Sequence, residues 1–206
     1  MTSRRKSAEL GLARIKMTRI SSLKPNVSRD QAVAAFNNPA RNLFRGPLRA
    51  VADFYIPFYL FTVGIKNRGH QTSSIFGLDA VNGTLDLYRF DHLPQETVQL
   101  ETRNVVPARL EEAASCELVI AKVRRVVFSS GFFRLRDLKI SAERHPQPIH
   151  IPYWVGFRGA NNADFVILDA VRRRVEGSKV RHIFHSWIAP FPDRTLVTAA
   201  SSKVLS

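Results

Sequence analysis

Two short sequence motifs occur twice in this chain, in the same order. Residues 56–59 read Ile-Pro-Phe-Tyr, and residues 151–154 read Ile-Pro-Tyr-Trp. Downstream of each copy the chain reads Leu-Asp-Ala-Val, at residues 78–81 and at residues 168–171. The interval between the two motifs is five residues shorter in the second copy, and length changes of this kind are tolerated where they fall in turns. The sequence therefore predicts a structural unit that is present twice.

The first half begins with a helical pattern and continues with strands. Ser28 is a suitable N-cap, and Gln31 completes a capping box for a helix over residues 28–36. Aromatic and β-branched residues then favour strands, and Asn82-Gly83 is typical of the turn in a two-residue hairpin. The strands expected here are residues 48–65, 75–81 and 84–90.

The second half has the same order. Pro107 suits the first turn of a helix because it lacks an N–H, and helical composition continues from Leu110 to Phe128. Four strands are expected to follow, at residues 133–142, 149–157, 165–171 and 179–187. Because proline cannot donate to a strand ladder, we expect Pro57 and Pro152 to start strands.

These elements predict an α+β protein made of two tandem repeats, each a helix packed on a three- to four-stranded antiparallel sheet. A lone unit of this size would leave an apolar face and open strand edges, so we expect the two units to pack together. The expected organisation is a basic flexible arm (1–24), a first repeat (25–91), a linker (92–106), a second repeat (107–188) and a C-terminal tail (189–206).

The chain carries a formal net charge of +14 that is unevenly distributed. Its first 50 residues hold 11 Lys and Arg but only 2 Asp and Glu. A basic arm on a nearly neutral body is typical of proteins that bind nucleic acid or an anionic surface. The anion contacts predicted on this basis are Arg4, Arg5 and Lys6 in the arm and Arg172, Arg173 and Arg174 in a turn.

The sequence does not contain a motif that identifies an enzyme. It lacks a nucleophile elbow, a P-loop and a dinucleotide-binding glycine pattern, and its carboxylates form no obvious catalytic pair. Cys116 is the only cysteine, and the histidines show no zinc-ligand spacing, so no cofactor or metal is expected. No apolar run reaches the roughly 18 to 20 residues of a membrane helix. We expect a cytoplasmic protein, with organelle targeting by the basic start as the alternative. The sequence predicts no oligomeric state.

The segment Asp79-Ala80-Val81-Asn82-Gly83 resembles the final hairpin of PepSY domains, and Asp169-Ala170-Val171 matches part of the same motif. The resemblance implies a short helix on a three-stranded antiparallel sheet. It also implies a non-catalytic module associated with binding, regulation or inhibition. The physical role that we expect for Asp79 and Asp169 is local, because a carboxylate at the entry of a turn can accept backbone N–H groups.

Aromatic residues follow both Ile-Pro motifs, and alternation along a strand places some of them in a core and others on a surface. Tyr59, Tyr153 and Trp154 are the candidate ligand or partner contacts. The leading hypothesis is a non-catalytic binding or regulatory module that recognises a protein or peptide. The alternatives are a basic accessory protein bound to nucleic acid or an anionic surface, and a small enzyme with its site between the repeats.

Overall fold

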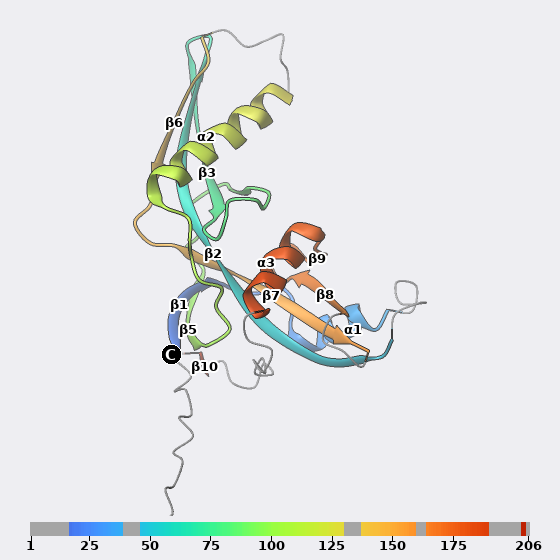
Figure 1. Ribbon diagram of the computed structural model, residues 1–206. Helices are drawn as coiled ribbons and strands as arrows, with labels where there is room; N and C mark the ends of the chain where they lie inside the picture. The colour runs from blue at the N-terminus through green and yellow to red at the C-terminus, as the bar shows by residue number, and fades with distance from the viewer. Residues whose placement is uncertain (1–16, 39–45, 130–136, 160–163, 190–202, 205–206) are drawn as a thin grey trace, which may run out of the picture.

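The computed structural model describes residues 17–38, 46–129, 137–159, 164–189 and 203–204. Within them, ten strands form one mixed sheet, and three helices pack against it (Figure 1). The helices are α1 (Arg29–Phe36), α2 (Glu112–Ser129) and α3 (Ser178–Ile188). The strands are β1 (Thr18–Leu23), β2 (Leu48–Asn67), β3 (His70–Asp79), β4 (Tyr88–Phe90), β5 (Thr97–Thr102), β6 (Lys139–Arg144), β7 (Ile149–Arg158), β8 (Asp164–Asp169), β9 (Arg174–Val175) and β10 (Lys203–Val204).

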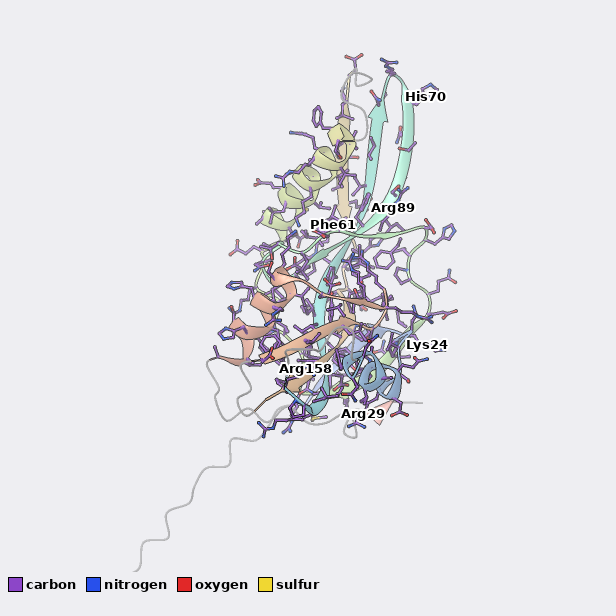
Figure 2. All side chains as sticks on the ribbon, turned by 90° about the vertical axis from the view of Figure 1, so that its right-hand side faces the viewer. Lys24, Arg29, Phe61, His70, Arg89 and Arg158 are labelled. Atoms are coloured by element: carbon purple, nitrogen blue, oxygen red, sulfur yellow. The ribbon has the colours of Figure 1, made fainter. Side chains whose placement is uncertain are left out.

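Strand β2 is the spine of the sheet, and its 20 residues run through the length of the molecule (Figure 1). On one edge, β2 pairs first with β7 and then with β6; on the other edge it pairs with β3. Figure 2 shows His70 at the far end of the β2–β3 hairpin and Arg158 and Arg29 at the opposite end of the molecule. Strand β2 therefore joins strands from both halves of the chain in one sheet.

The expected fold of two separate helix-on-sheet repeats is wrong, because the two halves share a single sheet. β2 and β7 pair with each other in antiparallel register over most of β7, and this pairing removes the open edges that two small sheets would leave. β1 lies in the segment expected to be a flexible arm, and β5 lies in the expected linker. These two strands also pair with each other, from Thr18 with Thr102 to Leu23 with Thr97.

The two Ile-Pro motifs face each other across the β2–β7 ladder. Ile56 is the partner of Ile151, and the carbonyls of Pro57 and Pro152 accept equivalent bonds from the Ala80 N–H at 2.8 Å and the Ala170 N–H at 3.1 Å. The expectation that the prolines start strands is wrong, since both lie inside β2 and β7. Each occupies the point on its edge where the pairing segment changes, so that no ladder bond is lost there.

Helices α1 and α2 pack on strands from the other half of the chain, whereas α3 packs on strands of its own half and on Phe54 of β2. Helix α1 packs through Phe36 against Trp154 of β7 and Leu168 of β8. Helix α2 packs through Val119 and Val123 on the surface of β2 and β3. Helix α3 covers the face of β7 opposite α1, where Tyr153 and Phe157 belong to the largest core cluster. A helix packed on its own small sheet is therefore not the unit of this fold.

Helix α3 replaces the strand expected at residues 179–187. Its buried side chains are Val180, Ile183, Phe184 and Trp187, and their spacing follows the helical period of 3.6 residues. The β-branched and aromatic composition of the segment suggested a strand. Burial of one amphipathic stripe is the physical reason for the helix.

Other local expectations had mixed outcomes. The Ser28 capping box with Gln31 is confirmed in both directions. Helix α2 begins at Glu112, several residues after Pro107. The chain after β3 forms a wider turn than the two-residue hairpin expected at Asn82-Gly83, and the returning strand is limited to β4. Residues 133–136 and nearly all of the expected tail lie outside the described residues.

Candidate functional site

The site begins with two turns that are held by buried aspartates. Asp79 Oδ1 accepts the N–H groups of Asn82 at 3.0 Å and Gly83 at 2.9 Å, and its Oδ2 accepts that of Leu85 at 2.8 Å. Asp169 Oδ1 accepts the N–H groups of Val171 at 2.8 Å and Arg172 at 2.7 Å. The turn-forming role expected for both aspartates is confirmed.

The two turns differ in the donor that bonds the second carboxylate oxygen, which is a backbone N–H of the same turn at Asp79. The Tyr88 hydroxyl, from the first half of the chain, donates to Asp169 Oδ2 in the second half. The Arg172 guanidinium lies over the Tyr88 ring, 3.4 Å from its centroid, and donates to the Leu87 carbonyl at 3.0 Å. These contacts tie the chain around β4 to the turn that follows β8.

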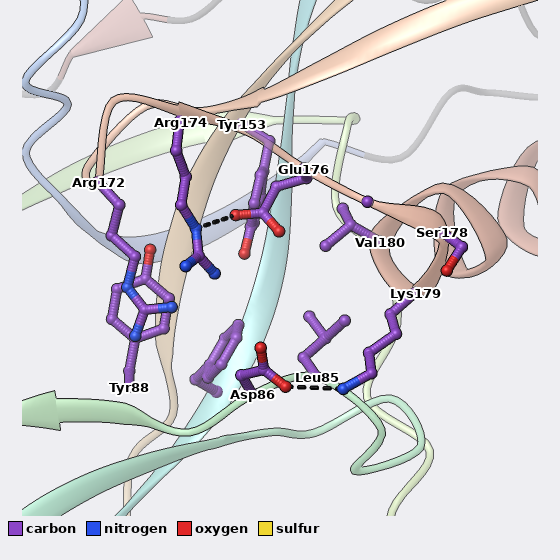
Figure 3. Close-up of a pocket in the computed structure, with 12 residues that line it drawn as sticks. Leu85, Asp86, Tyr88, Tyr153, Arg172, Arg174, Glu176, Ser178, Lys179 and Val180 are labelled. Atoms are coloured by element: carbon purple, nitrogen blue, oxygen red, sulfur yellow. Dashed lines mark hydrogen bonds and ion pairs between the residues drawn. The ribbon is translucent and has the colours of Figure 1, made fainter.

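A pocket of about 240 Å³ lies between these two segments (Figure 3). Two aromatic side chains at matching sheet positions belong to its lining: Phe58 is the partner of Asp79, and Tyr153 is the partner of Asp169. The other lining residues come from residues 85–88, from the turn through β9 and from the start of α3. They are Leu85, Asp86, Tyr88, Arg172, Arg174, Glu176, Gly177, Ser178, Lys179 and Val180.

Both carboxylates in the pocket lining have cationic partners (Figure 3). Lys179 Nζ lies 2.7 Å from Asp86 Oδ1 and joins α3 to the first half of the chain. Arg174 Nε lies 2.8 Å from Glu176 Oε1. The hydrogen bond from Lys179 lowers the pKa of Asp86, and the bond to Glu176 raises the pKa of Arg174. Asp86 and Arg174 therefore stay charged near neutral pH.

Tyr153 contributes a hydroxyl group to the pocket. Its side chain is directed into the pocket (Figure 3), and the residue is only 2% exposed. Among the described residues, no hydrogen-bond partner is found for its hydroxyl. Burial, together with the charge of Asp169, raises the pKa of Tyr153 well above its usual value. The hydroxyl therefore stays protonated and is available to donate a hydrogen bond.

The amino end of α3 supplies further donors. Gly177 is the N-cap of this helix, and no side chain accepts its first N–H groups. The first turn of a helix has N–H groups without partners inside the helix, and its dipole favours negative charge. Gly177, Ser178, Lys179 and Val180 all line the pocket. The amino end of α3 thus adds partial positive charge and N–H donors to the pocket.

The structure brings together three of the residues predicted from the sequence. Tyr153, Arg172 and Arg174 line the same pocket. Arg173 is exposed in the turn beside them, with a φ of 58°. Arg4, Arg5 and Lys6 lie outside the described residues, so a role of the basic arm with nucleic acid or an anionic surface stays a prediction.

Tyr59 and Trp154 lie outside the pocket. Trp154 Nε1 donates to the Val27 carbonyl at 2.9 Å, and Tyr59 Oη donates to the Leu110 carbonyl at 3.2 Å. Each bond holds the chain just before a helix against the strand that bears the aromatic residue. We therefore assign these two side chains to the packing of α1 and α2.

Sequence reasoning missed Asp86, Tyr88, Ser178 and Lys179. The helical spacing of apolar residues after Gly177 was a signal for the start of α3, and with it for Ser178 and Lys179. Tyr88 carried no such signal, because its partner Asp169 is 81 residues away. Only the pairing of the two halves brings them together.

Two features are absent from the described part of the chain. It contains no group of three or more His, Cys, Asp or Glu that could hold a metal ion. It also contains no helix that is long and apolar enough to cross a membrane.

Comparisons with known proteins identify no relative. No family model matches the chain, and neither curated proteins nor solved structures give a significant match. The PepSY resemblance therefore remains a prediction from a short motif.

Proposed function

We propose that this protein is a non-catalytic binding module and that it binds a small molecule in the pocket between the two halves. The observation that carries the proposal is the hydroxyl of Tyr153, a residue only 2% exposed, which is directed into the pocket without a partner among the described residues. A hydroxyl that has no protein partner can donate its hydrogen bond to a molecule held in the pocket. A bound ligand would supply that bond.

The composition of the pocket supports the same conclusion. Ligand sites are concave, largely apolar, and contain a few polar groups that fix orientation. Here Phe58, Leu85 and Val180 provide apolar surface, and the polar groups come from both halves of the chain. A ligand held at this position would contact both halves at once, which suits a regulatory role.

The electrostatics favour binding over catalysis. General acid–base catalysis needs a group whose pKa lies near the working pH. In this pocket the pKa values of Tyr88 and Tyr153 are raised, that of Asp86 is lowered, and that of Arg174 is raised. Each shift strengthens the charge state that the group already has at neutral pH. The polar groups of the pocket are therefore suited to hold a ligand.

The test is binding of a small panel of probes that share one apolar body: benzoate, benzamide and benzylamine. Ser178→Trp places a bulky side chain at an exposed position of the pocket lining, where it should fill the space without disturbing the core. Ser186→Trp makes the same change at an exposed position of α3 outside the pocket. Ligand-observed NMR titration measures the affinity of each probe for each variant.

We expect at least one probe to bind the wild-type protein and the Ser186→Trp variant equally. The same probe should bind Ser178→Trp at least tenfold more weakly. Failure of all three probes to bind at millimolar concentration would overturn the proposal. So would equal binding by the two tryptophan variants.

A further inference from the structure

The carboxylates of the pocket have cationic partners, whereas several of its hydrogen-bond donors have none. Of the two lining carboxylates, Asp86 is paired with Lys179 and Glu176 with Arg174. Asp169 beneath the pocket already accepts three bonds, from two backbone N–H groups and the Tyr88 hydroxyl. Each lining carboxylate is therefore already engaged through one oxygen by a cation of the protein.

The unused donors converge from two elements. From β7 comes the Tyr153 hydroxyl, which is directed into the pocket. From α3 come the first-turn N–H groups, which no side chain caps. A helix amino end binds anions readily, and the buried tyrosine is an independent sign that an acceptor is missing here. A ligand that satisfied both would have to be rich in acceptor oxygens.

Charge and shape narrow the ligand class further. Three cationic side chains line the pocket, namely Arg172, Arg174 and Lys179, against the two carboxylates. The excess of one positive charge, added to the helix end, favours a ligand with a negative charge. The remaining lining includes apolar surface from Phe58, Leu85 and Val180.

We infer that the ligand is a small organic carboxylate, with its anionic group at the Tyr153 hydroxyl and the amino end of α3 and its apolar body against Phe58, Leu85 and Val180. This inference rests on the proposed binding function and names its ligand class. The carboxylate would accept the donors that the protein leaves unused. The apolar body would displace water from the surface of Phe58, Leu85 and Val180.

Four probes separate the parts of this inference: benzoate, benzamide, acetate and inorganic phosphate. Benzamide has nearly the shape of benzoate without its charge, and acetate has the carboxylate without the apolar body. Phosphate tests whether any anion suffices. Isothermal titration calorimetry with the full chain measures each affinity.

We expect benzoate to bind at least tenfold more tightly than each of the other three probes. Tyr153→Phe removes only the hydroxyl and should weaken benzoate binding about tenfold while leaving benzamide nearly unchanged. Tyr59→Phe removes a tyrosine hydroxyl outside the pocket and should leave benzoate binding unchanged. Lys179→Gln, at an exposed position, gives a second route and should also weaken benzoate binding.

Each contrary result overturns a distinct claim. If benzamide binds the pocket as well as benzoate, the anionic class is wrong and the proposed binding function stands. If phosphate or acetate binds as tightly as benzoate, the contribution assigned to the apolar body is wrong. If benzoate binding is insensitive to both Tyr153→Phe and Lys179→Gln, the placement of the anionic group is wrong. If no probe of either panel binds, the proposed function fails as well.

Discussion

At the scale of single residues, the two turn aspartates are the clearest link between sequence and structure. Asp79 is 1% exposed and Asp169 is fully buried, yet each carboxylate accepts three hydrogen bonds. A buried carboxylate is tolerated when donors surround it. The third donor is the Leu85 backbone N–H at Asp79 and the Tyr88 hydroxyl at Asp169. The turn at Asp169 therefore joins the two halves of the chain, whereas the bonds of Asp79 stay within its own turn.

Asp79→Asn should lower the free energy of unfolding by about 2 kcal/mol, because the amide nitrogen cannot accept a bond and leaves a buried N–H unsatisfied. Urea denaturation followed by circular dichroism measures the change. Asp91→Asn, at an exposed position, is the matched control and should change stability by less than about 0.5 kcal/mol. Equal effects of the two substitutions would show that the Asp79 hydrogen bonds contribute little.

At the scale of elements, β1 is joined to β7 by a short parallel contact centred on His150. Ser22 is the partner of His150, and its hydroxyl donates to the His150 carbonyl at 3.1 Å. The His150 Nδ1 lies 3.1 Å from the Ser21 carbonyl. Burial is the main influence on this ring and lowers the pKa of His150; the bond to Ser21 opposes it in part. The contact between β1 and β7 therefore contains a histidine that is harder to protonate in the folded state than in the unfolded chain.

This histidine should make stability depend on pH. The unfolded chain takes up a proton near the ordinary value of about 6.5, whereas the folded chain does so only at lower pH. The stability linked to His150 is then complete above about pH 6.5. It is lost as pH falls from there toward the lowered folded value.

Urea denaturation at pH 7.5 and 5.5, on the order of one unit either side of the usual histidine pKa, measures the effect. We expect the wild-type protein to lose more stability over this interval than His150→Gln. The exposed His92 provides a control, since His92→Gln should keep the wild-type dependence. A decline of equal size in wild type and His150→Gln would rule out this source of pH dependence.

At the scale of the whole molecule, the two halves interlock. The Asn26 N–H donates to the Ala170 carbonyl and the Arg109 N–H to the Ala80 carbonyl, each at 2.8 Å. Each bond fixes the approach to a helix on the turn of the other half. With β2 paired to β7 and β1 to β5, neither half can satisfy its strand edges or cover its apolar faces by itself.

Fragments 1–91 and 92–206, expressed separately, should therefore fail to fold. The full chain should unfold in one cooperative transition, because no part of the interlocked sheet is independent. Dispersion of amide signals in NMR spectra reports folding of each fragment, and mixing them should restore the dispersion. A fragment that folds alone with its own melting transition would contradict this picture.

Several local features could be predicted from the sequence, and their causes lie within a few residues. The Ser28 capping box, the strand cores of β2, β7 and β8 and the turn roles of Asp79 and Asp169 belong to this group. The strand predicted at residues 179–187 is wrong because the segment has a strand-like composition, whereas its apolar residues have helical spacing. The strands β1 and β5 were missed because their polar, short segments gain order only by pairing with each other.

The candidate site was less predictable than the fold elements. Tyr153, Arg172 and Arg174 could be singled out by residue type. Nothing local distinguished Tyr153 from Trp154, its neighbour in sequence, which faces the other side of the sheet and packs under α1. Which of two adjacent aromatics lines a pocket depends on what covers each face.

The helix cap, the strand cores and the two aspartate turns follow from local sequence, since each depends on hydrogen bonds and periodicity within a short stretch. The pairing of β2 with β7, the packing of α1 and α2 on strands of the other half and the contact of Tyr88 with Asp169 follow only from the folded chain. The physical reason is that strand edges and apolar faces can be covered in several ways with similar local energies. The choice among them is made by contacts between residues far apart in the chain, and the pocket exists only where that choice brings the halves together.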